Sequence, residues 1–311
     1  MVLALALPFG VAAVGLGAPA AASFNPAGHD FWVDSSMGPI KTRIFRALDG
    51  NTSRVVYALD GLRARNDLSG WEIDTEVSRV LTQWNINVVM PVGGQSSFYS
   101  DWIAPSNTNG QQVRYEWETF LTENLRWALR DRLGFNPYGN GVFGLSMGGS
   151  AALALAAYHP DQFRYAGSYS GYLNISAPGM REGLRLALLD AGGFNIDAMW
   201  GPPWDPKWLR NDPFMFAPLL RKNGTRMWIA AGNGQSGPSD VIKEPIDAYH
   251  LSNAMALETI ALANTRAFQV RLDSLGGANV IFDYTSVGVH SWHYWEDQLY
   301  KMLPDMSAHL G

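Results

Sequence analysis

The sequence predicts an α/β fold in a single domain, with a mostly parallel central sheet and helices on both of its faces. Short apolar runs bounded by Gly, Asn or Pro alternate with longer helix-like segments along the chain. Strands buried on both faces of a parallel sheet have this appearance, and the alternation of strand and helix is typical of α/β domains. The 311 residues contain no internal repeat and no low-complexity linker, which favours one large domain over two.

Seven strands and five helices are predicted. The strands are 41–46, 54–59, 86–92, 140–145, 164–169, 226–231 and 279–284. The first two follow each other without a helix between them, so we expect them to form an antiparallel pair at the sheet edge. The helices are 74–84, 116–132, 147–158, 249–266 and 292–302. The segment 171–225 is rich in Gly, Pro and Trp, and we expect it to cross over the carboxyl end of the sheet.

The composition excludes several classes of protein. Hydrophobic residues make up 47% of the chain and include 12 Trp, which is enough to bury a large core and excludes disorder. The net charge of −5 and the lack of a basic block argue against nucleic-acid binding. The chain has no cysteine, so disulfides, cysteine-based zinc sites and a thiol nucleophile are excluded. Because no H-E-x-x-H, P-loop or dinucleotide motif is present, we expect neither a metal nor a cofactor.

The amino-terminal stretch predicts export. Residues 2–22 carry no charge, and the run ends in the small residues 18–23. An apolar run followed by small residues at a cleavage site is typical of a secretory signal. We assign this signal to 1–23 and the functional domain to 24–311. The run is also long enough to span a membrane, so an uncleaved anchor is the alternative. The sequence therefore predicts a protein that acts outside the cytoplasm or at the cell envelope.

The segment Gly144-Leu145-Ser146-Met147-Gly148 fits the pattern G-x-S-x-G. It joins the predicted strand 140–145 to a predicted helix, and a tight turn there would project the serine hydroxyl above the sheet, at the amino end of that helix. The helix dipole at this point favours developing negative charge. The pattern predicts that Ser146 is a nucleophile on an α/β-hydrolase fold; a glycine-rich turn with an inert serine is the alternative.

A serine nucleophile needs a base, and His290 is the candidate in the best place. It lies after the final predicted strand and before the last predicted helix, in a loop that would reach the same sheet edge as Ser146. His250 is the second choice. His293 falls inside the last helix, where we expect it to be a packed or surface residue.

Spacing alone leaves the identity of the acid open. In the predicted helix 249–266, the residues three or four positions from Glu258 are all apolar, and a carboxylate buried in such a stripe requires a partner such as an imidazole N–H. The competing carboxylates follow the strand 226–231 and precede or open this helix. They are Asp240, Glu244 and Asp247.

Longer motifs identify a resemblance. The chain resembles the antigen-85-type mycolyltransferases, which are secreted acyltransferases with an α/β-hydrolase fold, over nearly all of 37–303. The segments that carry the resemblance are LDGLRA at 59–64, GWEI at 70–73, MPVGGQSSFYSDW at 90–102, WETFLT at 117–122, GLSM at 144–147, AAYHP at 156–160, DAGG at 190–193, MWGP at 199–202, GNG at 232–234 and HSW at 290–292.

The resemblance implies roles for particular residues. It implies Ser146 as nucleophile, Glu258 as acid and His290 as base, with the backbone N–H groups of Leu62 and Met147 as oxyanion donors. It also implies a trehalose-binding surface that maps onto Asp60, Arg63, Asn174, Ser291 and Trp292.

The resemblance also implies substrates. The donor would be an acylated trehalose and the acceptor a sugar or glycolipid of the cell envelope, with diacylglycerol acyl transfer as a possible side activity. The alternative is a secreted carboxylesterase that uses the same triad with water. A third interpretation is a noncatalytic adhesin or carbohydrate binder, since some relatives have lost the triad, which is intact here.

Three departures from the family pattern are visible. Relatives carry a few cysteines, whereas Ala231 stands here in the strand before 232–234. Asp74 occupies a position where relatives carry Asn, and Gly148 replaces a usual Ala, which we expect to be harmless. Among the aromatic residues we expect most to be core, and those at 200–208, Trp102 and Trp292 to line a cleft.

Overall fold

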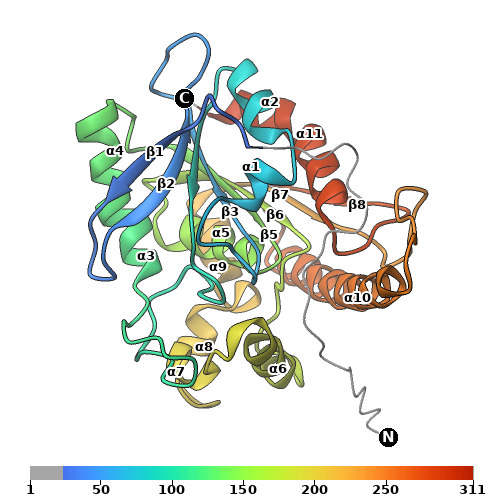
Figure 1. Cartoon of the computed structure of the whole chain (residues 1–311). Helices are drawn as coiled ribbons and strands as arrows, with labels where there is room; N and C mark the ends of the chain where they lie inside the picture. The colour runs from blue at the N-terminus through green and yellow to red at the C-terminus, as the bar shows by residue number, and fades with distance from the viewer. Residues whose placement is uncertain (1–23, 311) are drawn as a thin grey trace, which may run out of the picture.

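The central sheet has eight strands and is covered by helices on both faces (Figure 1). This computed structural model describes residues 24–310, so the predicted signal segment 1–23 lies outside the described residues. The strands are β1 His29–Val33, β2 Ile40–Phe45, β3 Val55–Leu59, β4 Asn87–Pro91, β5 Asn140–Leu145, β6 Phe163–Tyr169, β7 Arg226–Ala231 and β8 Val280–Tyr284. The α/β fold class predicted from the sequence is confirmed.

The helices connect and flank these strands. They are α1 Gly70–Ile73, α2 Val77–Gln83, α3 Trp117–Thr119, the π-helical η1 Phe120–Asn124, α4 Leu125–Leu133, α5 Met147–Tyr158, α6 Met180–Gly192, α7 Ile196–Trp200, α8 Lys207–Arg210, α9 Pro213–Asn223, α10 Pro245–Ser274 and α11 Trp292–His309. The predicted helix 147–158 agrees with α5, whereas α10 and α11 both extend beyond their predicted ends. Within the described residues, no helix is long and apolar enough to cross a membrane.

The strand order is β1-β2-β4-β3-β5-β6-β7-β8. All pairs from β4 to β8 are parallel, and β2 is antiparallel to both β1 and β4. The prediction that 41–46 and 54–59 pair with each other is wrong, because β4 lies between β2 and β3. The partner of β2 at the edge is β1, a five-residue strand that opens with His29 and Asp30 and has only three apolar residues to mark it.

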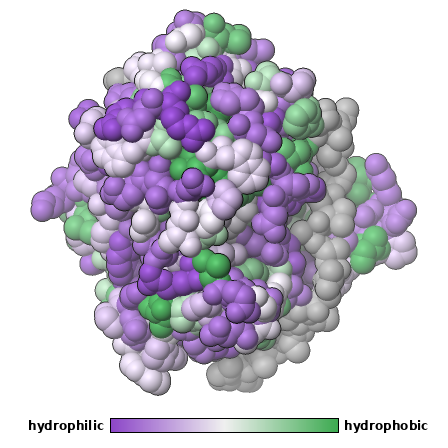
Figure 2. Space-filling view, turned by 60° about the vertical axis from the view of Figure 1, so that its left-hand side comes forward, coloured by the Kyte–Doolittle hydropathy of each residue, from purple (hydrophilic) through white to green (hydrophobic). Residues whose placement is uncertain are grey.

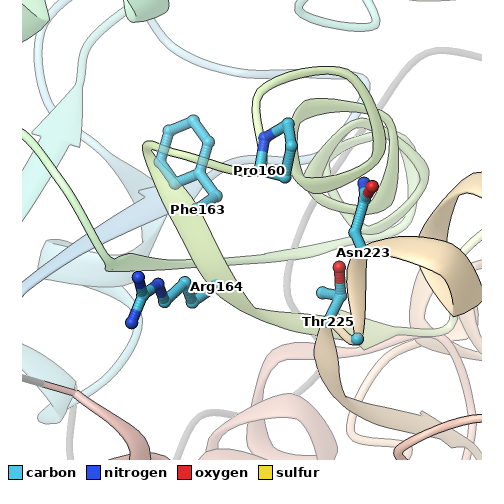
Figure 3. A pocket seen from close by; sticks show the side chains of 6 residues that line it. Pro160, Phe163, Arg164, Asn223 and Thr225 are labelled. Atoms are coloured by element: carbon cyan, nitrogen blue, oxygen red, sulfur yellow. The ribbon is translucent and has the colours of Figure 1, made fainter.

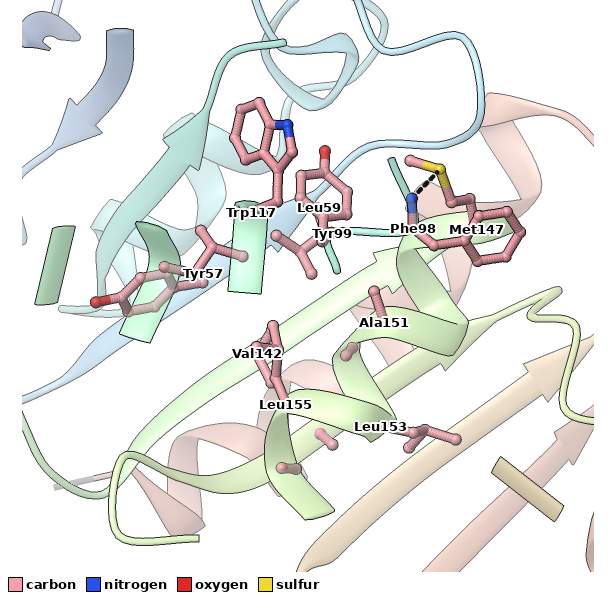
Figure 4. Packing of buried hydrophobic residues seen from close by; sticks show 14 of the residues in the cluster. Tyr57, Leu59, Phe98, Tyr99, Trp117, Val142, Met147, Ala151, Leu153 and Leu155 are labelled. Carbon is pink, nitrogen blue, oxygen red and sulfur yellow. Dashed lines mark hydrogen bonds between the residues drawn. The ribbon is translucent and has the colours of Figure 1, made fainter. Parts of the chain in front are cut away.

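Side chains alternate between the two faces of the sheet and form two cores. Tyr57 and Leu59 of β3 belong to the cluster covered by α4, α5, α9 and α10, whereas Val56 and Ala58 belong to the cluster covered by α1, α2 and α11. Figure 4 shows the first cluster around α5, where Met147 packs inward and its sulfur accepts the Phe98 N–H at 3.1 Å. The outer face in Figure 2 is mostly hydrophilic, with small separate hydrophobic areas.

The segment 171–225 forms helices α6 to α9 and belongs to the same domain. Helices α6, α7 and α8 lie together at one end of the sheet (Figure 1). This is the carboxyl end, because Arg63, after β3, pairs with Asp190 of α6, and the Ile103 N–H, after β4, donates to the Ala198 carbonyl of α7 at 3.1 Å.

The expectation that aromatic residues of this region line a cleft is wrong for three tryptophans. Trp102, Trp200 and Trp208 are buried in the first core cluster, at 0%, 1% and 1% exposure. Each indole N–H is satisfied inside the protein, by the Ser97 carbonyl, the Ser100 hydroxyl and the Gly201 carbonyl respectively. These rings therefore hold the segment to the domain and leave no indole surface free for a ligand.

Glycines at the β5–α5 turn allow the backbones of β5, of α5 and of the end of β3 to approach one another closely. A Cβ on Gly144 would lie 2.5 Å from the backbone of Gly148, and a Cβ on Gly148 would lie 2.5 Å from the carbonyl oxygen of Asp60. Such contacts are well inside van der Waals distance and involve backbone, which cannot move aside cheaply. Gly148 is therefore a packing requirement in this chain rather than a harmless replacement.

Gly144→Ala is expected to lower the free energy of unfolding by about 1–3 kcal/mol, because the added methyl group overpacks a backbone contact. Gly183→Ala is the matched control, since nothing lies within 4 Å of a Cβ at this helical position of α6. The control should raise stability by about 0.5–1 kcal/mol, because alanine loses less backbone entropy than glycine on folding. Urea denaturation measures both changes; equal effects of the two substitutions would contradict the packing argument.

Candidate active site

Ser146 occupies a strained turn between β5 and α5. Its backbone has φ 52° and ψ −121°, an unusual conformation for a residue other than glycine. The turn is held because the Ser146 N–H donates to the Tyr169 carbonyl at 2.8 Å and the Ser146 carbonyl accepts the Gly149 N–H at 3.0 Å. The strained strand–turn–helix geometry is that of a nucleophile elbow.

Glu258 and His290 form a buried pair beside the carboxyl ends of β6 and β7. The His290 Nδ1 lies 2.9 Å from Glu258 Oε2, and the side chains are 1% exposed for the acid and 9% for the base. Glu258 lies on the buried stripe of α10 with Ala254 and Ala261, so the helix phase inferred from the sequence agrees with the structure. The His290 backbone N–H also donates to the Ala254 carbonyl at 3.2 Å, which fixes the loop to α10.

Two further groups hold the Glu258 carboxylate, and sequence reasoning missed both. Glu258 Oε1 accepts the Ser170 hydroxyl at 2.7 Å and the Gly232 N–H at 2.6 Å. Ser170 in turn accepts the Trp295 indole N–H at 2.9 Å. A buried carboxylate needs such donors, and in this structure they are supplied by the ends of β6 and β7. The only sequence signal would have been the position of Ser170 and Gly232 immediately after two predicted strands.

Tyr172, which follows β6, packs beside the histidine. Its ring lies nearly parallel to the His290 ring, at 6.3 Å between centroids and 24° between planes. Within residues 24–310, no direct hydrogen bond joins the Ser146 and His290 side chains. The structure thus brings the three predicted residues to one edge of the sheet.

The two predicted oxyanion donors are available. Across the described chain, neither the Leu62 N–H nor the Met147 N–H donates to a protein acceptor. Met147 is the first residue of α5, where the N–H groups have no partner inside the helix and the dipole favours an anion. The Leu62 carbonyl accepts the Ser96 N–H at 2.9 Å, which fixes the loop that carries the other donor.

The competing acids and the second-choice base have other contacts. Glu244 and Asp247 form the capping box of α10. Asp240 accepts the Tyr294 hydroxyl at 2.7 Å and faces His293 at 3.6 Å. His250 is 8% exposed, and neither ring nitrogen has a hydrogen-bond partner within the described residues. None of these groups contacts Glu258 or His290 by a hydrogen bond in the described part of the chain.

The predicted substrate-binding residues differ in accessibility. Arg63 is 32% exposed and pairs with Asp190, and Asn174 and Trp292 are partly exposed. Ser291 is buried, and its hydroxyl lies 3.1 Å from His293 Nδ1. Asp60 is also buried, and its carboxylate accepts the Ser69 hydroxyl and the Gly70 N–H.

Burial raises the pKa of Asp60 to about 7. Hydrogen bonds from Gly70 and Ser69 oppose this effect, and the charge of the partly buried Asp74 adds to it. Burial also raises the pKa of Asp74 itself. Asp74, which stands where relatives carry Asn, therefore helps to raise the pKa of Asp60. Asp60 lies next to the loop that carries Leu62.

A hollow of about 410 Å³ lies elsewhere (Figure 3). It is lined by Pro160, Phe163, Arg164, Asn223, Gly224 and Thr225. Phe163 begins β6 and Thr225 precedes β7, so the hollow lies at the amino ends of strands whose carboxyl ends carry the Glu258 donors. It is separate from the Ser146 region.

Comparisons with known proteins identify the family. The family model described as "Putative esterase" matches residues 39–306. The chain is 42% identical over 298 residues to the diacylglycerol acyltransferase/mycolyltransferase Ag85C of Mycobacterium avium, covering 96% of this chain and 82% of that protein. It is 44% identical over 264 residues to the corresponding Ag85B protein of Mycolicibacterium smegmatis, covering 84% and 79%. The chain belongs to the Ag85 acyltransferase family.

Solved structures agree with this membership. The crystal structure of Mycobacterium tuberculosis MPT51 matches with a TM-score of 0.77 and 30% identity, covering 92% of this chain and 100% of that one. An S-formylglutathione hydrolase from Agrobacterium tumefaciens shares the fold alone, with a TM-score of 0.63 and 16% identity over 94% of this chain and 99% of that one. The resemblance and the acyltransferase class expected from the sequence are confirmed; the individual roles of the Ag85-type site residues stay predictions.

The raised pKa of Asp60 predicts a pH-dependent effect of Asp60→Asn on stability. The folded protein retains a proton on Asp60 up to about pH 7, whereas the unfolded chain releases it near the ordinary aspartate pKa of 3.8. Wild type therefore loses stability between about pH 4 and pH 7, by up to about 4 kcal/mol from this group, and the uncharged Asn variant does not. The Asn variant should gain stability relative to wild type over that window.

Urea denaturation at pH 4 and pH 8 measures this difference. Asp34→Asn is the matched control, because it makes the same charge change at an exposed position between β1 and β2. A stability difference for Asp60→Asn that is the same at both pH values would contradict the burial argument.

Proposed function

We propose that this Ag85-family protein transfers a long-chain, mycolyl-type acyl group between trehalose-based glycolipids, or onto sugars of the cell envelope, through an acyl group on Ser146. The observation that carries the proposal is the buried Glu258–His290 pair beside the strained Ser146 turn. The names of the relatives, diacylglycerol acyltransferase/mycolyltransferase, support the acyl-transfer chemistry. An exported location follows from the apolar amino-terminal run.

The first half of the reaction forms the acyl-enzyme. Ser146 Oγ attacks the ester carbonyl carbon while His290 takes the serine proton on Nε2, because Nδ1 faces Glu258 at 2.9 Å. The carbonyl oxygen gains negative charge and is stabilised by the N–H groups of Leu62 and Met147, each worth roughly 3–4 kcal/mol in comparable sites. The tetrahedral intermediate then breaks down: the ester C–O bond cleaves, and the leaving sugar oxygen receives the proton from His290.

The second half transfers the acyl group. An acceptor hydroxyl loses its proton to His290 and attacks the acyl carbon, and Ser146 leaves with that proton restored. Glu258 holds the imidazole in the required tautomer and stabilises its protonated form. Since the carboxylate has two other donors, in Ser170 and Gly232, it stays fixed when the histidine changes charge.

Sugar recognition is proposed to use the residues after β3, β6 and β8. Arg63, Asn174 and Trp292 are partly exposed and can contact a sugar directly. Asp60 and Ser291 are buried, so they would act by ordering Gly70 and the His290 loop.

The alternative is a carboxylesterase that uses water as the acceptor, which the esterase family match favours. Both activities use the same acyl-serine, so the products distinguish them. Purified protein incubated with a trehalose monoester should give the diester and free trehalose, detected by mass spectrometry. Free acid without diester would support the esterase and contradict acyl transfer.

Ser146→Ala is expected to reduce acyl transfer by at least about a thousandfold, since removal of a triad nucleophile leaves only residual catalysis. Ser252→Ala is the control, because this exposed serine lies on α10 and its hydroxyl donates to the Tyr249 carbonyl of the same helix at 2.8 Å. The measurement is the initial rate of diester formation. Comparable rates for wild type and Ser146→Ala would contradict the assignment of Ser146 as nucleophile.

A further inference from the structure

Ser291 stands at the start of the last helix but does not cap it. It is the N-cap residue of α11 and has an extended backbone, yet its side chain makes no capping hydrogen bond. A serine in this position usually accepts a backbone N–H from the first turn of the helix. Here its hydroxyl lies 3.1 Å from Nδ1 of His293, and across the described residues this is the one hydrogen bond of the Ser291 side chain. Because Ser291 follows His290 directly, the contact joins the loop of the proposed base to a side chain of α11.

The other ring nitrogen of His293 faces a buried carboxylate. Nε2 lies 3.6 Å from Asp240 Oδ1, and the two side chains are 12% and 0% exposed. Neither atom has a hydrogen-bond partner within residues 24–310. The distance is longer than that of a hydrogen bond, so the contact is an electrostatic one between the ring and the carboxylate. Since an unpartnered buried polar atom is costly and a carboxylate oxygen accepts, the ring N–H belongs on Nε2, directed to Asp240.

The protonation of His293 sets the direction of these contacts. Burial lowers the pKa of His293, while the charges of Asp240, Asp297 and Glu296 oppose this effect, so the ring is neutral at neutral pH. A neutral imidazole has one N–H and one acceptor nitrogen. With the N–H on Nε2, Nδ1 is the acceptor and the Ser291 hydroxyl is the donor. The contacts therefore run from Ser291 through His293 to Asp240.

Asp240 is a fixed point for this connection. Its Oδ2 accepts the Gly237 N–H at 2.8 Å, which holds the carboxylate to its own loop. The same oxygen accepts the Tyr294 hydroxyl at 2.7 Å, which holds it to α11. The position of the carboxylate is therefore set by two bonds that do not involve His293.

The loop that carries Asp240 also holds the residues before the proposed base. The Gly288 N–H donates to the Gln235 carbonyl at 2.8 Å, and the Gly288 carbonyl accepts the Gly234 N–H at 2.9 Å. One loop after β7 thus supports His290 from both sides along the chain, through Gly288 before it and through Asp240 after it.

We infer that His293 is a positioning residue for the proposed base: it connects Ser291 to Asp240 and so keeps the His290 ring in place against Glu258. The Nδ1 of His290 lies 2.9 Å from Glu258 Oε2, and a small shift of the loop would lengthen that bond and misalign Nε2. His293 does not touch the reacting atoms and exchanges no proton with substrate. The inference rests on the proposed function in that Ser146 is the nucleophile and His290 the base, but not on the identity of the acyl donor or acceptor.

The test compares His293→Ala, Ser291→Ala and the double variant. The full-length protein is reacted with an alkyl fluorophosphonate, which contains no sugar, so that a role of Ser291 in sugar binding does not affect the result. Covalent labelling is followed by intact-protein mass spectrometry over a range of reagent concentrations. Each single substitution is expected to lower the maximal labelling rate constant about tenfold, with the concentration for half-maximal labelling unchanged. The double variant should also lose about tenfold, because both residues act through one connection.

His159→Ala is the matched control. It also removes an imidazole that contacts a carboxylate, since His159 Nε2 lies 2.8 Å from Glu118 Oε1, but it lies at the opposite end of α5 from Ser146. It should label with the rate constant of wild type. A purely structural effect of any substitution would lower the fraction of protein that becomes labelled, whereas a displaced base lowers the rate constant of the folded fraction.

The outcomes separate this inference from the proposed function. Equal maximal rate constants for wild type and His293→Ala, with Ser146→Ala unlabelled, would overturn the role of His293 alone. A loss of about a hundredfold in the double variant would show that the two residues act independently, and would overturn the connection through Ser291. The same loss of rate in His159→Ala would attribute the effect to general destabilisation and would also overturn the role of His293. Equal labelling of wild type and Ser146→Ala would overturn the proposed nucleophile and, with it, the inference.

Discussion

The burial of one carboxylate organises the proposed catalytic edge of this protein. Glu258 is 1% exposed, and an ionised carboxylate in that position is costly unless donors surround it. Its three partners are Ser170 after β6, Gly232 after β7 and His290 after β8. Each comes from a different strand end, so the charge is stabilised only when the sheet, the long helix α10 and the last loop are all assembled.

The parallel strand order explains why these partners meet. Neighbouring parallel strands end at the same edge, and β5, β6, β7 and β8 are consecutive in the sheet. Ser146 follows the first of them, and the other three supply the carboxylate donors in turn. Helices α5 and α10 lie on one face, whereas α11, which carries Trp295, covers the other. The site therefore spans the sheet edge and is fixed from both faces.

Local patterns in the sequence were sufficient for part of this arrangement. The Ser146 elbow and the helix phase of Glu258 could be predicted, because both depend on short-range spacing. The pairing of β2 could not, since it depends on β1, whose apolar part is only three residues long, and on β4, which lies more than 40 residues further along the chain. Ser170 was also missed, because its role arises from a contact with a residue 88 positions away that no local pattern reveals. The resemblance supplied the acyltransferase class, but not this contact.

The choice between transfer and hydrolysis depends on structure outside the triad, since both reactions use the same acyl-serine. The segment 171–225 packs against the rest of the domain through the buried indoles of Trp200 and Trp208. It also contacts the loops after β3 and β4 through Asp190 and Ala198. Those two loops flank the elbow, and the first carries the predicted oxyanion donor Leu62. Under the proposed function, the selection of an acceptor over water therefore depends on residues other than the serine, the histidine and the acid.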